Sequence, residues 1–193
     1  MILLDTNILT LFFDPTARAL KNIDKAPQRV KHFIERCEKQ RKKIVIPTPI
    51  LSELLVLFKP EKQEEYFRII NNSKNFIVAD FDKRAAIELA IMQSKLLSNN
   101  QRKKMLKDAW QKVKLDCQVV AIAKVNQVEA IYTDDKGMKT FATTNKIEVK
   151  DSSAFELPPK EAQMNIFEDK EGNPKAKVES HKKGIHKKPS GKK

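Results

Sequence analysis

Residues 1–9 read MILLDTNIL and place one carboxylate, Asp5, directly after three aliphatic residues. The aliphatic run is typical of a buried strand, and an uncompensated charge at the end of such a strand is costly. Thr6 and Asn7 follow before the apolar pattern resumes at Ile8. The position of Asp5 therefore needs an explanation from the rest of the chain, either a binding partner for its charge or a polar edge of the fold.

Short β-like runs alternate with longer helical patterns throughout residues 1–159. The expected strands are Met1–Leu4, Lys43–Ile46, Phe76–Ala79, Ala130–Thr133 and Lys146–Val149. Helix signals occupy all four intervals between these strands. The alternation predicts an α/β domain with a central, mainly parallel sheet of about five strands and a ligand site outside their carboxyl ends.

The clearest helix signal is PTPILSELLVLF at residues 47–58. Thr48 is expected to cap this helix, Pro49 suits its first position, and an i, i+3, i+4, i+7 apolar stripe begins at Leu51. The other expected helices are Glu61–Asn71, Asp82–Leu97, Gln101–Asn126 and Lys136–Thr144.

The chain is strongly basic, with 38 Lys and Arg against 25 Asp and Glu and a formal net charge of +13. Such a charge favours polyanionic partners, with nucleic acid ahead of anionic membrane. Lysines are frequent and large apolar residues scarce after the Pro158-Pro159 pair. We therefore predict a folded domain at residues 1–157 and a lysine-rich, disordered tail at residues 158–193, which either solubilises the protein or binds phosphates.

Cysteine and histidine usage excludes several kinds of site. Cys37 and Cys117 lie far apart without metal-ligand spacing, which predicts reduced core thiols and a cytoplasmic protein. Three scattered histidines argue against a zinc or histidine-based catalytic site. No signal peptide is expected. No uncharged stretch reaches the ~18 residues of a membrane-spanning helix, so no membrane partner is expected.

Acids recur where an apolar core would not favour them. Asp134 and Asp135 follow the fourth expected strand as Asp5 follows the first, so they would be neighbours if these strands pair. Glu53 and Asp116 interrupt apolar helical stretches, and either one alone is more simply a solvent-facing residue at the rim of its helix. The expected core face of the helix that carries Asp116 is marked by Leu115, Val119, Ile122 and Ala123. If all these carboxylates converged, they would repel one another strongly.

A divalent cation would relieve that repulsion. Mg²⁺ or Mn²⁺ prefers oxygen ligands and is usually held by one or two carboxylates together with substrate phosphate. An acidic pocket on a basic chain then becomes reasonable, because the basic surface attracts a phosphate backbone and the cation neutralises the pocket. The reaction implied is phosphodiester hydrolysis by a metal-activated water.

Four segments of the chain, taken together and in order, resemble the signature segments of PIN-domain ribonucleases, including the VapC-like toxins of toxin–antitoxin systems. They are LLDTNIL at 3–9, SELLVL at 52–57, KLDCQVVAIA at 114–123 and IYTDDKGM at 131–138. The resemblance covers about residues 1–150. It implies a PIN-like three-layer α/β/α sandwich and a metal-dependent endoribonuclease that uses Mg²⁺ or Mn²⁺.

The resemblance also implies roles for individual residues. The catalytic carboxylates that it implies, also metal ligands, are Asp5, Glu53, Asp116 and Asp135. The Thr-x-Asp pattern of the family selects Asp135 as the fourth acid and leaves Asp134 as a neighbouring candidate ligand. Asn7 matches a position that supports the first aspartate through hydrogen bonds, and Thr6 and Thr133 are further supporting candidates.

The partners implied by the resemblance are an RNA substrate, an antitoxin and a second copy of the chain. An antitoxin would block the acidic pocket with an inserted arginine, because a guanidinium matches carboxylates in charge and geometry. Two features depart from the small toxins of the family and bear on the toxin role: a longer, more basic region between Lys59 and Trp110, and the lysine-rich tail.

Three other functions are compatible with parts of the sequence. A haloacid-dehalogenase-like phosphatase also begins with a strand ending in aspartate, but its second acid is replaced here by Asn7, which cannot donate a proton in that role. A receiver-like phosphoacceptor domain would need an acidic pair after the first strand, which is absent. A non-catalytic RNA-binding adapter with a PIN-like core remains an alternative, although none of the four acids is replaced by a neutral residue.

Overall fold

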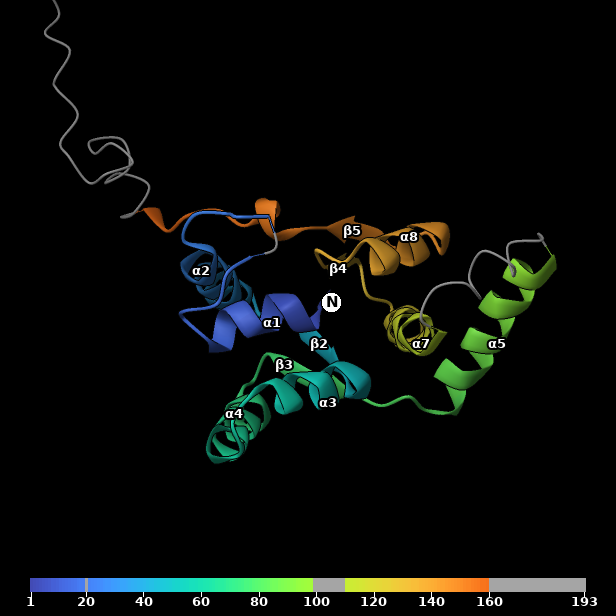
Figure 1. The fold of residues 1–193 in the computed structure, drawn as a ribbon, viewed down its shortest axis with the longest axis horizontal. Helices are drawn as coiled ribbons and strands as arrows, with labels where there is room; N and C mark the ends of the chain where they lie inside the picture. The colour runs from blue at the N-terminus through green and yellow to red at the C-terminus, as the bar shows by residue number, and fades with distance from the viewer. Residues whose placement is uncertain (20, 99–109, 160–193) are drawn as a thin grey trace, which may run out of the picture. The chain divides into compact units, whose positions relative to one another are not determined.

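A five-stranded sheet organises the protein (Figure 1), and the computed structural model describes residues 1–19, 21–98 and 110–159. The strands are β1 Ile2–Leu4, β2 Ile44–Pro47, β3 Phe76–Ala79, β4 Ala130–Tyr132 and β5 Glu148–Lys150. Their order is β3-β2-β1-β4-β5, and every neighbouring pair is parallel. The prediction of an α/β sandwich on a parallel sheet is therefore confirmed.

The central strand β1 separates the two halves of the sheet. Ile2 is in register with Ile44 of β2 on one side and with Ala130 of β4 on the other. Because the strand order reverses at β1, the crevice that open parallel sheets use for ligands lies at the carboxyl ends of β1 and β4. Asp5 follows the first of these strands directly, and the Thr133–Asp135 turn follows the second.

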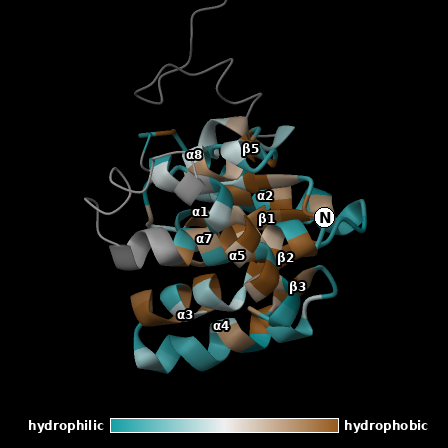
Figure 2. Cartoon of the chain, turned by 90° about the vertical axis from the view of Figure 1, so that its right-hand side faces the viewer, coloured by the Kyte–Doolittle hydropathy of each residue, from teal (hydrophilic) through white to brown (hydrophobic). Residues whose placement is uncertain are grey.

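Burial follows position in the sheet. Every residue of β1, β2 and β4 is buried, because inner strands of a parallel sheet are covered on both faces. The edge strand β3 exposes Ile77 and Val78 at 36% each. Figure 2 shows β1 and β2 as an apolar centre, with the largely hydrophilic helix α4 at the periphery.

Seven α-helices and one 3₁₀ turn occur among the described residues. They are α1 Thr6–Phe13, α2 Ala26–Lys39, α3 Thr48–Leu57, α4 Pro60–Asn72, α5 Lys83–Ser98, α7 Trp110–Val125, α8 Lys136–Thr144 and η1 Ser152–Ala154. The long helix expected at Gln101–Asn126 is described from Trp110 onward, and residues 101–109 lie outside the described part. Helix α7 packs against β2, α3, α5 and α8, and this packing brings Asp116 of α7 close to the sheet.

Three local predictions were wrong. Helix α3 begins at Thr48 itself, its N-cap residue is Pro47, and no side chain caps it. Leu115, expected in the core, is 37% exposed, because the buried part of α7 begins at Cys117. The last strand starts two residues later than expected, since the positive φ of 62° at Lys146 forms the turn before it.

The described chain agrees with one further expectation. Cys37 and Cys117 are buried free thiols. No helix within residues 1–19, 21–98 or 110–159 combines the length and the apolar character needed to cross a membrane. Residues Met1–Pro158 form one compact unit. The predicted tail at 158–193 lies outside the described residues from 160 onward, so its disorder stays a prediction.

Candidate metal centre

Two of the predicted site acids are N-caps of helices that begin directly after a strand. Asp5 caps α1 and accepts a 2.7 Å hydrogen bond from the Thr6 amide. Asp135 caps α8 and accepts a 2.9 Å hydrogen bond from the Met138 amide. Free amides and the helix dipole favour a negative side chain at both places. Each strand-to-helix turn thus fixes one carboxylate at the ligand edge of the sheet.

Asp5 is the most buried of the four predicted catalytic acids, with only 7% of its surface exposed. Its Oδ2 accepts a 2.5 Å hydrogen bond from the Thr133 hydroxyl. Burial raises the pKa of Asp5 above its ordinary value, and the charges of Glu53 and Asp135 raise it further, against the hydrogen bonds from Thr133 and Thr6. The neighbouring acids are therefore close enough to Asp5 to disfavour its ionised form.

Asp116 and Asp135 face a common space over Gly137. A methyl carbon placed on Gly137 would lie 3.1 Å from Oδ1 of Asp135 and 3.2 Å from Oδ2 of Asp116. Asp116 lies in the middle of α7 and Asp135 is the N-cap of α8, so the two carboxylates come from separate elements. The missing side chain at residue 137 leaves the space between them open.

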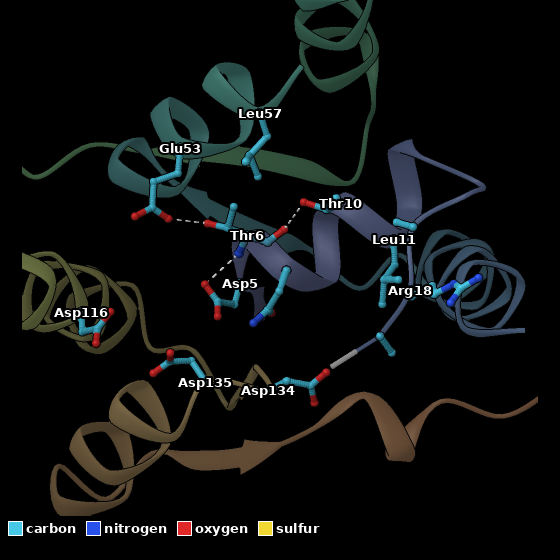
Figure 3. A pocket seen from close by; sticks show the side chains of 13 residues that line it. Asp5, Thr6, Thr10, Leu11, Arg18, Glu53, Leu57, Asp116, Asp134 and Asp135 are labelled. Carbon is cyan, nitrogen blue, oxygen red and sulfur yellow. Dashed lines mark hydrogen bonds between the residues drawn. The ribbon is translucent and has the colours of Figure 1, made fainter. Parts of the chain in front are cut away.

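Glu53 lies at the outer side of this group. It is exposed on α3, and its Oε2 accepts a 2.6 Å hydrogen bond from the Thr6 hydroxyl. Because the Thr6 amide donates to Asp5, the two acids are connected through a single residue. Figure 3 shows Asp5, Asp116 and Asp135 projecting toward one another from three elements, with Glu53 facing them from α3.

Asp134 has a different role from its neighbour. Its Oδ1 accepts hydrogen bonds from the Ser152 amide at 3.0 Å and the Ser152 hydroxyl at 2.9 Å, and it is 8% exposed. In Figure 3 its carboxylate points away from that of Asp135. The geometry therefore gives Asp134 a structural contact with the segment after β5 and leaves Asp135 as the acid of this pair that faces the others.

The hydrogen bonds that support Asp5 come from Thr6 and Thr133, two of the three predicted supporting residues. Within the described part of the chain, no hydrogen bond joins Asn7 to Asp5. The Oδ1 atom of Asn7 is buried and has no hydrogen-bond partner there. This acceptor lines the same pocket as the acids, so it is an additional oxygen for a cation or a ligand donor.

The acids line one cavity of about 310 Å³ at the carboxyl ends of β1 and β4. Its lining residues are Asp5, Thr6, Asn7, Thr10, Leu11, Ala17, Arg18, Ala19, Glu53, Leu57, Asp116, Asp134 and Asp135. All predicted site residues except Thr133 line it. Sequence reasoning missed Arg18 and Thr10. Arg18 follows α1 in an irregular segment of a chain rich in basic residues, where no pattern distinguishes it.

The site is an open arrangement of acids. Among the residues that the structure describes, no group of three or more Asp, Glu, His or Cys side chains is gathered as a ready-made metal cage. Mg²⁺ keeps several waters and commonly uses one or two carboxylates plus substrate phosphate, so it does not need such a cage. Asp116 and Asp135 over Gly137, with the unpaired Asn7 oxygen in the same cavity, fit that mode of binding.

Comparisons with known proteins establish the fold. The sequence matches no protein-family profile and no curated protein. A chain in the crystal structure of VapBC2 from Rickettsia felis, bound to a DNA fragment from their promoter, superposes with a TM-score of 0.54. The match has 17% identity and covers 78% of this chain and 98% of that one. A chain in the crystal structure of DNA-bound VapBC from Salmonella typhimurium superposes with a TM-score of 0.51. That match has 19% identity and covers 79% of this chain and 99% of that one. The likeness shows that this chain shares its fold, a PIN-like sandwich, with a chain of these VapBC complexes.

Proposed function

We propose that the protein is a metal-dependent endoribonuclease that hydrolyses RNA phosphodiester bonds at Asp5, Glu53, Asp116 and Asp135 with Mg²⁺ or Mn²⁺. The observation that carries the proposal is the pair Asp116 and Asp135. Their carboxylates, from separate elements, border the same open space over Gly137, at the edge of the sheet where parallel α/β folds bind ligands.

Each acid has a distinct part in this proposal. Asp116 and Asp135 would hold the cation, which supplies an activated water and stabilises the charge that develops on phosphate oxygens. Asp5 contributes a buried charge at the back of the site, held in one orientation by Thr133. Glu53 is exposed and engages Thr6 through Oε2 alone, so its Oε1 is placed to accept a proton from water.

The charge distribution supports a polyanionic substrate. The chain carries a formal charge of +13, yet the cavity is lined by five acids and a single arginine among its charged residues. Long-range attraction would bring a phosphate backbone to the protein, whereas the acids alone would repel it at the last step. A cation between the acids removes this conflict, which explains why metal and substrate would bind together.

We also propose that the protein is the toxin of a toxin–antitoxin pair. The fold resemblance to chains of VapBC complexes supports this role. Leu57 lines the acidic cavity and is 61% exposed, and its neighbour Val56 is 78% exposed. An antitoxin segment that covers these apolar side chains and places a cation among the acids would both bind and inhibit the protein.

A second candidate function is that of an RNA-binding adapter without catalysis. It is favoured by the formal charge of +13, which attracts RNA whether or not a cation occupies the acidic cavity. The adapter would bind RNA through its basic surface and would show no metal requirement.

The test is cleavage of total RNA by the purified full-length protein with Mg²⁺ or Mn²⁺, followed by sequencing of the products. We expect specific cleavage that EDTA stops and that Asp5→Asn and Asp116→Asn abolish while RNA binding persists. Glu64→Gln, which neutralises an exposed acid on α4, is the matched control and should cleave normally. Undiminished cleavage by both aspartate variants contradicts the site, and binding without cleavage by the wild type favours the adapter.

A further inference from the structure

We infer that Arg18 binds a backbone phosphate next to the scissile one, so that the cavity accepts an oligonucleotide strand and not an isolated phosphate ester. The inference deepens the proposed function and rests on it. It concerns the side of the cavity opposite Asp116 and Asp135.

Arg18 shares its cavity with the acids. It lies in the segment between α1 and α2 and lines the same 310 Å³ space as Asp5, Asp116 and Asp135. Figure 3 shows Asp116 and Asp135 on one side of this space and Arg18 on the other, with the guanidinium of Arg18 turned outward from the acids. A strand that leaves the cavity on this side would therefore pass the guanidinium.

The guanidinium of Arg18 is uncommitted in the described structure. Four other arginines bind protein oxygens: Arg29 binds two backbone carbonyls, and Arg36, Arg68 and Arg84 bind carboxylates. Arg18 makes no hydrogen bond or ion pair with any described residue, although several carboxylates line its cavity. Its five N–H donors remain available to a ligand.

The chemistry of this end selects a phosphodiester strand. A planar guanidinium pairs with phosphate through two parallel hydrogen bonds. The lining of the cavity also includes the apolar residues Leu11, Ala17 and Leu57. A nucleotide within a strand presents a phosphate, the apolar face of its base and the next phosphate, which suit a cation, these apolar residues and Arg18. A single phosphate ester at the acidic end would leave Arg18 without a partner.

Binding measurements test the contact separately from the reaction. The probe is a fluorescently labelled, mixed-sequence single-stranded RNA. Its affinity for the full-length Asp116→Asn protein, which is expected not to cleave it, is measured at several KCl concentrations. Adding Arg18→Ala should weaken binding about tenfold at low salt, the effect of one charged hydrogen-bond pair. It should also make the slope of log K against log salt shallower by about 0.7, the value for one phosphate of a single strand.

Two further variants serve as controls. Arg18→Lys keeps the charge and should retain the salt slope, although it loses the two-point geometry. Arg84→Ala removes an equal charge from an exposed arginine outside the cavity and should leave both quantities unchanged. Because Arg18 is exposed, its variants should melt at the wild-type temperature.

Cleavage provides a second readout. In the otherwise unaltered protein, Arg18→Ala should raise KM for an RNA strand about tenfold and leave kcat unchanged, because the contact is equal in the ground and transition states. A dinucleotide with a single phosphodiester lacks the neighbouring phosphate, and its cleavage should not respond to the substitution.

The outcomes separate the two proposals. Equal slopes and affinities for Arg18→Ala and Arg84→Ala overturn the Arg18 contact and leave the nuclease intact. A shifted slope in a protein that never cleaves RNA supports the Arg18 contact and contradicts the nuclease. A loss of kcat without any change in binding overturns the inference, and absence of RNA binding overturns both proposals.

Discussion

The hydroxyl of Thr133 donates a 2.5 Å hydrogen bond to Oδ2 of Asp5 across 128 positions of the chain. The hydroxyl oxygen of Thr133 in turn accepts a 3.0 Å hydrogen bond from the amide of Asp135. Thr133 follows β4 and Asp5 follows β1, so this side chain joins the two turns that present site acids. One fully buried hydroxyl thus positions both Asp5 and the turn that carries Asp135.

Thr133→Val should damage stability and activity together. It keeps the shape of the side chain but removes the donor to a buried carboxylate, at a cost of about 1.5–3 kcal/mol in the free energy of unfolding. It should also raise the pKa of Asp5 further, because the hydrogen bond lowers that pKa. Urea denaturation and RNA cleavage measure the two effects. Thr133→Ser retains the hydroxyl and should behave like the wild type, and an equally stable Thr133→Val protein would contradict the role of this bond.

Gly137→Ala should separate activity from stability. The new methyl group would lie 3.1 Å from Asp135 Oδ1 and 3.2 Å from Asp116 Oδ2, so both carboxylates must shift from the space where a cation would bind. Alanine is favoured over glycine in a helix, which offsets the strain on the Asp135 cap, so the melting temperature should stay close to that of the wild type. We expect at least tenfold weaker Mn²⁺ binding by calorimetry.

The control for Gly137→Ala is Thr140→Ala, an exposed substitution on the same helix. It should leave Mn²⁺ binding unchanged. Wild-type metal binding by Gly137→Ala would show that the space over residue 137 is not the cation site.

Most of the fold was predictable because its signals are local. Three inner strands are short apolar runs with complete burial, and the spacing between runs fits parallel crossovers. The errors arose where tertiary contacts override local preference. Thr48 has the chemistry of a cap but lies one residue inside α3, and Leu115 has the chemistry of a core residue but lies before α7 becomes buried.

The candidate site was predictable only in part. Asp5 and Asp135 follow strands, so topology places them at one edge without further information. Whether Asp134 or Asp135 faces the other acids depends on Ser152, which is remote in sequence and has no distinguishing pattern. Arg18 lies outside any helix or strand, where periodicity gives no orientation. Its relevance emerges only from the cavity that it shares with the acids.

Asp134 and Asp135 should respond oppositely to substitution. Asp134→Ala leaves the amide and hydroxyl of the buried Ser152 without their acceptor, and we expect a loss of about 1–3 kcal/mol in stability with cleavage retained at low temperature. Asp135→Asn can keep its helix cap through Oδ1 but loses its charge, so stability should persist while cleavage disappears. Thermal melts and cleavage assays of both variants check this. Retained activity in Asp135→Asn with lost activity in a folded Asp134→Ala would reverse the assignment.

Low pH should destabilise the folded protein through Glu129, which lies at the amino end of β4, on the side of the sheet away from the candidate site. Hydrogen bonds from Lys42 and the Met1 amine, together with their charges, lower the pKa of Glu129 from 4.5 to about 2. A lowered carboxyl pKa stabilises the folded state fully above pH 4.5, and this contribution is lost as the pH falls toward 2. Urea midpoints of wild type and Glu129→Gln should therefore differ at pH 6 and converge near pH 2.

The control for that comparison is Glu148→Gln, which neutralises an exposed acid on β5 that pairs with the single cation of Lys150. Its urea midpoint should follow the wild type more closely over the same pH range. RNA cleavage at neutral pH should be unchanged in Glu129→Gln, because Glu129 lies at the amino end of β4, away from the acids. A pH-independent difference between wild type and Glu129→Gln would contradict the role of the ion pair.

The central claim is that Asp116 and Asp135 share a divalent cation, and a calorimetric Mn²⁺ titration of the full-length protein tests it most directly. We predict one saturable binding event in the wild type and in the Glu64→Gln control. The Asp116→Asn/Asp135→Asn double variant should lose it while keeping the wild-type melting temperature. Mn²⁺ binding of equal affinity in the double variant, or no binding by the wild type with or without RNA, would contradict the claim.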